Sequence, residues 1–308
     1  MPSDAALKQA LTPVARELVD RHLSNAPEWF PHEYVPWGRG RDFDEGYEWE
    51  PAESTMSEAV RSALFVNLLT EDNLPHYFWT IDRTFGGDAD DVWGEWTRRW
   101  TAEEGRHSIV IRDYLTITRA IDPVDLERGR MIQVAKGQVP MFDTVAEGLT
   151  YVAVQELATR ISHANTGRLM DEKVGHKIMA RVSGDEMLHH VFYRDLVSSL
   201  IELDVSTAVL AIDETVRGFA MPGTGIPGFD SHSRAIAAAG IYDLAVFHDS
   251  ILQPVVIEAW GLTEITGLSD EAEQARDRCL AHIERVGRLG RRLVEKRDAK
   301  SVSVAATG

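Results

Sequence analysis

The chain contains a single cysteine, Cys279, among its 308 residues. One thiol cannot form an internal disulfide, so a disulfide-stabilised secreted domain is excluded and a reducing interior is favoured. No stretch of about 18 apolar residues occurs, so no membrane span is expected. The first residues carry neither a basic start nor an apolar segment, so no secretory signal is predicted. We therefore expect a cytoplasmic protein.

Positive charge is scarce. The sequence has 32 Lys and Arg against 49 Asp and Glu, a formal net charge of −17. Such a chain would be repelled by a phosphate backbone, which argues against nucleic acid as a partner. Positive charge gathers between Arg276 and Lys300, where nine Lys or Arg accompany four Asp or Glu. This basic stretch indicates either a docking surface for an acidic partner or a solvated helix face.

Alternating strand patterns and long linkers are also missing from the sequence. Apolar residues instead recur at spacings of three and four, the period of amphipathic helices. Helices are expected at residues 4–23, 56–84, 90–119, 122–135, 144–170, 172–203, 206–219, 242–260 and 269–298. Residues 26–53, rich in aromatic, acidic, Pro and Gly residues, are expected to form an irregular strap. The fold prediction is one all-α domain spanning residues 1–308.

Two of the eleven histidines follow a glutamate by three residues. The pairs are Glu104–His107 and Glu186–His189. Residues i and i+3 of a helix point in similar directions, so both side chains of a pair reach one point. Two Glu-x-x-His segments on separate helices are the ligand pattern of a bundle that holds two metal ions.

That pattern requires one further glutamate from each of two other helices. Glu71 and Glu156 each interrupt an apolar helical segment that precedes one of the two pairs. Four buried carboxylates need compensating charge, which two divalent cations would supply. Oxygen-rich ligands with one imidazole per metal suit iron or manganese better than a structural zinc site. The resulting prediction is a ferritin-like four-helix core at about residues 54–204, followed by C-terminal helices at 205–298.

An acid precedes each Glu-x-x-His pair, Glu103 in one case and Asp185 in the other. Metal-bound histidine usually donates its second N–H to a carboxylate. A symmetric bundle would bring Asp185 to His107 and Glu103 to His189. The alternative is that both acids lie on solvated helix faces.

At these residues the sequence resembles the soluble acyl-[acyl-carrier-protein] desaturases, the stearoyl-type family. The likeness spans about residues 15–260. Its blocks are Trp29-Phe-Pro-His-Glu-Tyr34, Thr70-Glu-Asp-Asn-Leu-Pro75, Trp96-Thr-Arg-Arg-Trp-Thr-Ala-Glu-Glu-Gly-Arg-His107, Gln155-Glu-Leu-Ala-Thr-Arg-Ile-Ser-His-Ala-Asn-Thr-Gly167 and Asp185-Glu-Met-Leu-His189.

The resemblance implies roles for individual residues. The two ions would be iron, bridged by Glu104 and Glu186 and completed at the ends by the other four ligands. Thr159 would be a proton-relay hydroxyl, although it could equally bond back to its own helix. Trp29 would join the histidine–aspartate chain as an electron route, or serve only in packing.

The resemblance also implies the reaction. A cis double bond is introduced into an acyl chain on an acyl carrier protein, using O₂ and two electrons from a ferredoxin-type donor. The enzyme would be a homodimer. A substrate channel is expected beside Phe78, Trp79, Leu149 and Val152, with Gly148 allowing the chain close to the backbone. Ordinary core packing explains these residues equally well.

Two other functions fit the same ligands. One is a di-iron oxygenase that hydroxylates or oxidises another small molecule. The other is a ferritin-like iron-binding protein without an organic substrate.

Overall fold

A computed structural model describes residues 3–137, 139–221, 223, 225–226 and 228–305, and the side chains through residue 299. Within this part the chain forms eleven α-helices, a π-helix and three short 3₁₀ helices, and it has no strand. The α-helices are α1 (Asp4–Asn25), α2 (Glu58–Glu71), α3 (Leu74–Phe85), α4 (Val92–Ile117), α5 (Pro123–Lys136), α6 (Val145–Arg168), α7 (Lys173–Leu203), α8 (Val205–Gly218), α9 (Phe229–Ala238), α10 (Leu244–Phe247) and α11 (Asp270–Ala305). The all-α prediction is confirmed.

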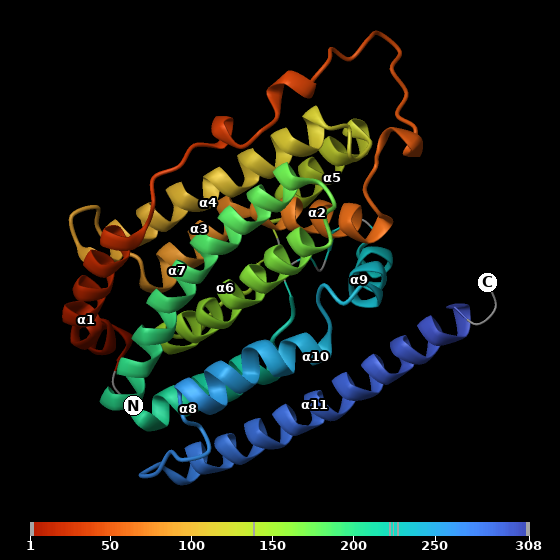
Figure 1. The fold of residues 1–308 in the computed structure, drawn as a ribbon. Helices are drawn as coiled ribbons and strands as arrows, with labels where there is room; N and C mark the ends of the chain where they lie inside the picture. Colours follow the sequence, from red (N-terminus) through yellow and green to blue (C-terminus); the bar gives the residue numbers. More distant parts are fainter. Residues whose placement is uncertain (1–2, 138, 222, 224, 227, 306–308) are drawn as a thin grey trace.

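Four helices form the central bundle, namely α2, α4, α6 and α7. Each packs against two others, so that α2 contacts α4 and α6, and α7 contacts the same two helices (Figure 1). Helix α5 is the crossover between the two halves of the bundle. Helix α6 is buried nearly all around its circumference, which explains why its sequence lacks the single polar side of an amphipathic surface helix.

The expected single helix at 56–84 is wrong. The chain breaks at Asp72-Asn73 and forms two helices, α2 and α3. Pro75 lies in the first turn of α3. In a continuous helix, Pro75 would lack the N–H that bonds the carbonyl of Glu71 and its ring would clash there. The break makes Glu71 the last residue of α2.

Residues 26–53 form the expected strap. Its only regular structure is three short 3₁₀ helices, at Pro31–Glu33, Trp37–Arg39 and Pro51–Glu53. The strap, red to orange in Figure 1, runs along the α4 side of the bundle. Helix α1 packs against α4 and α7 before the strap begins.

The C-terminal helices cover the opposite side of the bundle, where α8 and α11 pack against each other (Figure 1). Two features differ from expectation. Helix α9 was not predicted. The segment expected as a helix at 242–260 is a short α10 followed by a π-helix, His248–Ala259, which contains Pro254. Among the described residues, no helix is both long enough and apolar enough to span a bilayer.

Candidate metal centre

The bundle brings all six predicted ligands together in its interior. Glu71 comes from α2, Glu104 and His107 from α4, Glu156 from α6, and Glu186 and His189 from α7. None is more than 6% exposed. They form two groups whose donor atoms lie within 4.8 Å of one another: Glu71, Glu104, His107 and Glu186 in one, and Glu104, Glu156, Glu186 and His189 in the other. Glu104 and Glu186 belong to both groups and therefore occupy the middle of the site.

Buried oxygen and nitrogen atoms that could coordinate a metal lack hydrogen bonds here, which favours a site for two cations. Buried Glu104 Oε1, His107 Nδ1, Glu156 Oε2 and His189 Nδ1 make no hydrogen bond with the described residues. His189 Nδ1 lies 2.8 Å from Glu104 Oε1, a contact that is an ion pair only when the imidazole carries a second proton. A buried polar atom without a partner costs about 1–3 kcal/mol. Four such atoms from four of the six residues face one small volume. The residues therefore could hold metal ions, whose coordination would satisfy these atoms.

The acids Asp185 and Glu103 make the predicted crossed contacts. Asp185 Oδ2 lies 3.4 Å from Nε2 of His107, and Glu103 Oε2 lies 2.9 Å from Nε2 of His189. A carboxylate at Nε2 favours the proton on that nitrogen and leaves the Nδ1 lone pair for the centre. Trp29 also donates from Nε1 to Asp185 Oδ2, at 2.7 Å.

The electrostatics of the site follow from burial and crowded acids. Burial raises the pKa of Glu104 and Glu156, and the carboxylate of Glu186 raises both further. Burial would also raise the pKa of Asp185, but its hydrogen bond with His107 outweighs this and lowers it to about 2. The outer acid Asp185 is therefore charged near neutral pH. Burial and crowding disfavour the charged forms of Glu104 and Glu156, which a bound cation would stabilise.

Three residues around the centre were missed by the sequence reasoning, and two of them contact ligands directly. His163 Nε2 lies 2.9 Å from Glu71 Oε1. Trp100 donates from Nε1 to Glu156 Oε1 at 3.1 Å. A signal for His163 existed, because it follows Glu156 by seven residues, two turns along the same face of α6.

The third missed residue is His22 of α1, which is 4% exposed. Its Nε2 lies 2.9 Å from Glu103 Oε2, the atom that also meets His189. Arg99 donates to the other oxygen of Glu103 at 2.6 Å. His22 precedes Glu103 by 81 residues in sequence, so no local spacing could indicate this contact.

Thr159 makes both contacts that the sequence left open. Its hydroxyl lies 3.1 Å from the carbonyl of Gln155 and 3.0 Å from that of Glu156, and it also lies 3.0 Å from Glu186 Oε2. A hydroxyl has one proton to donate, so these acceptors compete for it. The hydroxyl is thus in position to exchange hydrogen bonds between its own helix and the centre.

A cavity of about 80 Å³ reaches the centre from the α9 side. It is lined by Val66, Asn67, Thr70, Glu71, Thr159, Ser162, His163, Met221, Phe229, Ser233, Ile236 and Tyr242. An adjoining cavity of about 290 Å³ shares Thr70 and Met221 with it and continues past Tyr77 and Tyr151. Together they lead from α9, past a candidate ligand, into the space between α3 and α6.

None of the five predicted channel residues lines either cavity. Trp79 is 51% exposed, and Phe78 precedes it on the same surface helix. Leu149 and Val152 are packed in the main hydrophobic core. A Cβ on Gly148 would lie 3.0 Å from Thr84 Cγ2 and 3.1 Å from Phe85 Cε1. The missing side chain of Gly148 therefore lets α3 and α6 pack closely.

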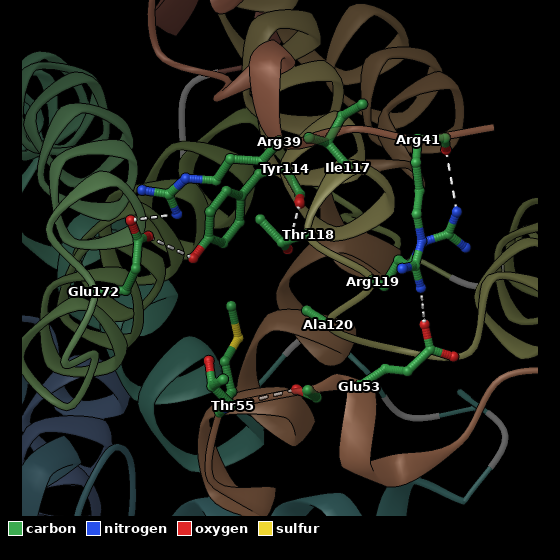
Figure 2. A pocket seen from close by; sticks show the side chains of 12 residues that line it. Arg39, Arg41, Glu53, Thr55, Tyr114, Ile117, Thr118, Arg119, Ala120 and Glu172 are labelled. Atoms are coloured by element: carbon green, nitrogen blue, oxygen red, sulfur yellow. Dashed lines mark hydrogen bonds and ion pairs between the residues drawn. The ribbon is translucent and has the colours of Figure 1, made fainter.

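A separate surface pocket of about 430 Å³ lies where the strap meets the end of α4 (Figure 2). Arg39 pairs with Glu172 at 2.9 Å, and Arg41 pairs with Glu53 at 2.8 Å. Arg119 donates to the carbonyl of Arg41 at 3.1 Å. These interactions attach the strap to α4 and to the start of α7, and the charges of Arg39 and Arg41 are already compensated.

Three comparisons with known proteins find relatives along most of the chain. Residues 4–307 match the model of a family described as fatty acid desaturase. A relative named putative acyl-[acyl-carrier-protein] desaturase DesA1, from Mycobacterium tuberculosis, is 38% identical, over 89% of this chain and 83% of its own length. A chloroplastic stearoyl-[acyl-carrier-protein] 9-desaturase from Spinacia oleracea is 30% identical, over 87% of this chain and 71% of its own length.

A solved structure is similar as well. The X-ray structure of putative acyl-ACP desaturase DesA2 from Mycobacterium tuberculosis H37Rv aligns with a TM-score of 0.71 and 28% identity. The alignment covers 88% of this chain and 99% of that one. The likeness therefore extends over the bundle and most of the surrounding helices.

Proposed function

The chain belongs to the fatty acid desaturase family and is a desaturase, an oxidoreductase; from this premise we propose its substrate and its centre. The substrate is a saturated acyl chain on an acyl carrier protein, and the product carries a cis double bond. The reaction removes two hydrogen atoms from neighbouring methylene groups. With two further electrons and two protons, these hydrogens reduce O₂ to two molecules of water.

The observation that carries this proposal is the buried set of four carboxylates and two imidazoles with unsatisfied donor atoms. We assign Glu71, Glu104, His107, Glu156, Glu186 and His189 as ligands of two iron ions, with Glu104 and Glu186 shared between them. When bound, such an iron pair supplies the redox chemistry that activates O₂. Two electrons come from an external donor such as a ferredoxin.

The surrounding residues have positioning roles in this proposal. Asp185 and Glu103 hold the imidazoles of His107 and His189 in one tautomer. Trp29, bonded to Asp185, is assigned to the electron route. Thr159, 3.0 Å from Glu186 Oε2, is assigned to hold and pass a proton at that oxygen.

The acyl chain is assigned to the cavity that begins at α9. Phe229 and Ile236 give this cavity apolar walls, as a hydrocarbon chain requires. The cavity passes Glu71 and Thr159, so one segment of a bound chain would lie beside the centre. Tyr77 and Tyr151 line the adjoining cavity, which would hold the rest of the chain.

The test combines metal analysis with product analysis. Purified protein is expected to contain two irons per chain. Incubation with palmitoyl-loaded carrier protein, ferredoxin, a reductase and O₂ is expected to yield an acyl product lighter by two hydrogens. A gain of one oxygen would identify a hydroxylase instead, and bound iron without any acyl product would indicate an iron-binding protein. The predicted homodimer is tested separately by the mass of the particle in solution.

A further inference from the structure

The C-terminal half of α11 has an exposed, positively charged side. We define this basic face by five residues, Arg285, Arg288, Arg291, Arg292 and Lys296, all of which are exposed. At about 100° per residue, they fall within less than half of the helix circumference. The opposite side of α11, including Ile283 and Val286, is buried against the protein. The five cations therefore project away from the body of the molecule together.

The positive charge of this face is only partly compensated. Two exposed acids, Glu284 and Glu295, lie on the same side of the helix, so the five cations minus these two acids leave a formal charge of +3. Within the described chain, only Arg288 of the five forms an ion pair, with Glu284 at 3.4 Å, in a pair exposed to solvent. In contrast, Arg278, about two turns before Arg285, forms an ion pair with Asp213 at 2.9 Å. The expected basic stretch of 276–300 thus divides into an early part that attaches α11 to α8 and a later part that faces solvent.

Two exposed leucines border the basic face. Leu289 is 38% exposed and Leu293 is 46% exposed. They lie four residues apart, one turn of the same helix. Cations beside exposed apolar side chains suit a protein partner that offers acidic groups around an apolar patch.

The part of α11 that carries the basic face is attached to α9, the helix that lines the cavity reaching the candidate centre, through Arg297 on the opposite, protein-facing side of α11. Arg297, the residue after Lys296, lies 2.9 Å from Asp243 Oδ2 and 3.3 Å from the carbonyl of Ala237. Ala237 follows Ile236, which lines that cavity. Figure 1 shows the C-terminal half of α11 passing below α9.

We propose that the basic face of α11 docks the acidic acyl carrier protein and thereby delivers the acyl chain to the cavity beneath α9. This inference rests on the proposed function. Carrier proteins of this kind are acidic, and the enzyme itself has a net charge of −17. Most of its surface therefore repels such a partner. A local cluster of cations on the helix attached to α9 overcomes that repulsion and orients the complex.

The test is the double charge reversal R291E/R292E. Both side chains are exposed and form no ion pair within the described chain, so the fold should tolerate the change. We expect the KM for palmitoyl-loaded carrier protein to rise about tenfold, with kcat and iron content unchanged. The rise of KM with added salt should also become shallower than in the wild type.

A matched control is K173E/K177E. Lys173 and Lys177 are exposed at the start of α7 and form no ion pair within the described chain, and their reversal changes the net charge equally. We expect it to leave the KM for the loaded carrier nearly unchanged. An equal rise in both variants would overturn the proposal, because net charge alone would then explain it. A rise only in the KM for ferredoxin would also overturn it, since the face would serve the reductant.

Direct binding separates this proposal from the proposed function. The affinity for palmitoyl-loaded carrier protein is measured by calorimetry, without turnover. If the wild type forms no desaturated product, the proposed function fails. The docking proposal is then decided by whether R291E/R292E, unlike K173E/K177E, weakens binding about tenfold. Equal affinity in the wild type and R291E/R292E would overturn it.

Discussion

At one end of the candidate centre, Glu71 lines the cavity beneath α9, whereas at the other end Glu156 and His189 lie against Trp100 and Trp96 and line no cavity described above. Near Glu71, His163 lies 2.9 Å from a carboxylate oxygen, and Asn67 Nδ2 lies 3.2 Å from the other ring nitrogen of His163. This polar chain borders the cavity beneath α9.

The other end is closed by aromatic rings. Trp100 donates a hydrogen bond to Glu156. The rings of Trp96 and His189 meet edge to face, with their centroids 6.2 Å apart. Trp96 also stacks on Phe192 at 3.6 Å. The two halves of the bundle therefore supply similar ligand sets with different surroundings. The difference supports the proposal that substrate approaches from the Glu71 end, while aromatic rings cover the Glu156 end.

The largest expected effect is the loss of iron on replacing a ligand that belongs to both groups, compared with a ligand that belongs to one group only. Glu186→Gln should abolish binding of both irons, because Glu186 belongs to both ligand groups. Glu71→Gln should mainly reduce binding at the open end. Turnover should fall more than about 10²-fold in the first variant, beyond the cost of losing an outer-shell partner. Iron per chain is measured by mass spectrometry. Two irons retained in Glu186→Gln would contradict its shared position.

The next effect concerns the acid behind the open end. Asp185→Ala removes the acceptor at His107 Nε2 and the partner of Trp29. Iron affinity should fall about 10–100-fold, as it does when other carboxylates that accept a hydrogen bond from a metal-bound histidine are removed. Competition with a coloured chelator measures this affinity. Unchanged affinity together with unchanged activity would remove Asp185 from the proposed centre.

A third substitution tests which end admits substrate. Ile236→Trp adds bulk at a residue that lines the cavity on the Glu71 side. We expect turnover of acyl substrate to fall about tenfold or more while iron content stays at the wild-type level. Ala238→Trp, at an exposed position of the same helix, is the matched control and should be nearly silent. Equal turnover in both variants would show that the chain enters elsewhere.

A fourth substitution asks whether the chain passes Gly148. An alanine there would press on Thr84 and Phe85, so the free energy of unfolding should fall by about 1 kcal/mol. Because Gly148 lines neither cavity beside the centre, the position of the double bond should not move. Chemical denaturation and product analysis measure the two effects. A shifted double bond with unchanged stability would restore the channel predicted from sequence.

The smallest expected effect is on the labelling rate of Cys279. This buried thiol lies outside the candidate centre, so its labelling rate reports whether a variant keeps the native fold. Burial raises the pKa of this thiol to about 12, and Asp213 contributes to the rise. Because the pKa is raised, the reactive thiolate stays scarce through pH 9. Labelling by a disulfide reagent should therefore be slow in native protein and reach one thiol after unfolding. Fast labelling of a variant would show that its substitution had disturbed the fold.

Several features followed from the sequence itself. The helical period of apolar residues predicted most elements, since it depends only on the geometry of one helix. The spacing of Glu104 to His107 and of Glu186 to His189 predicted the ligands for the same reason, because residues i and i+3 share a face. The break that makes Glu71 a helix end was also readable from Pro75, although it was overlooked.

Tertiary packing alone decided the surroundings of the ligands. His22 reaches Glu103 from α1, and Trp100 reaches Glu156 across the bundle, distances in sequence that no local spacing encodes. The cavity beneath α9 arises where α2, α6 and α9 meet. Which end of the centre is open depends on how those helices assemble, whereas the identity of the ligands depends on the geometry within each helix.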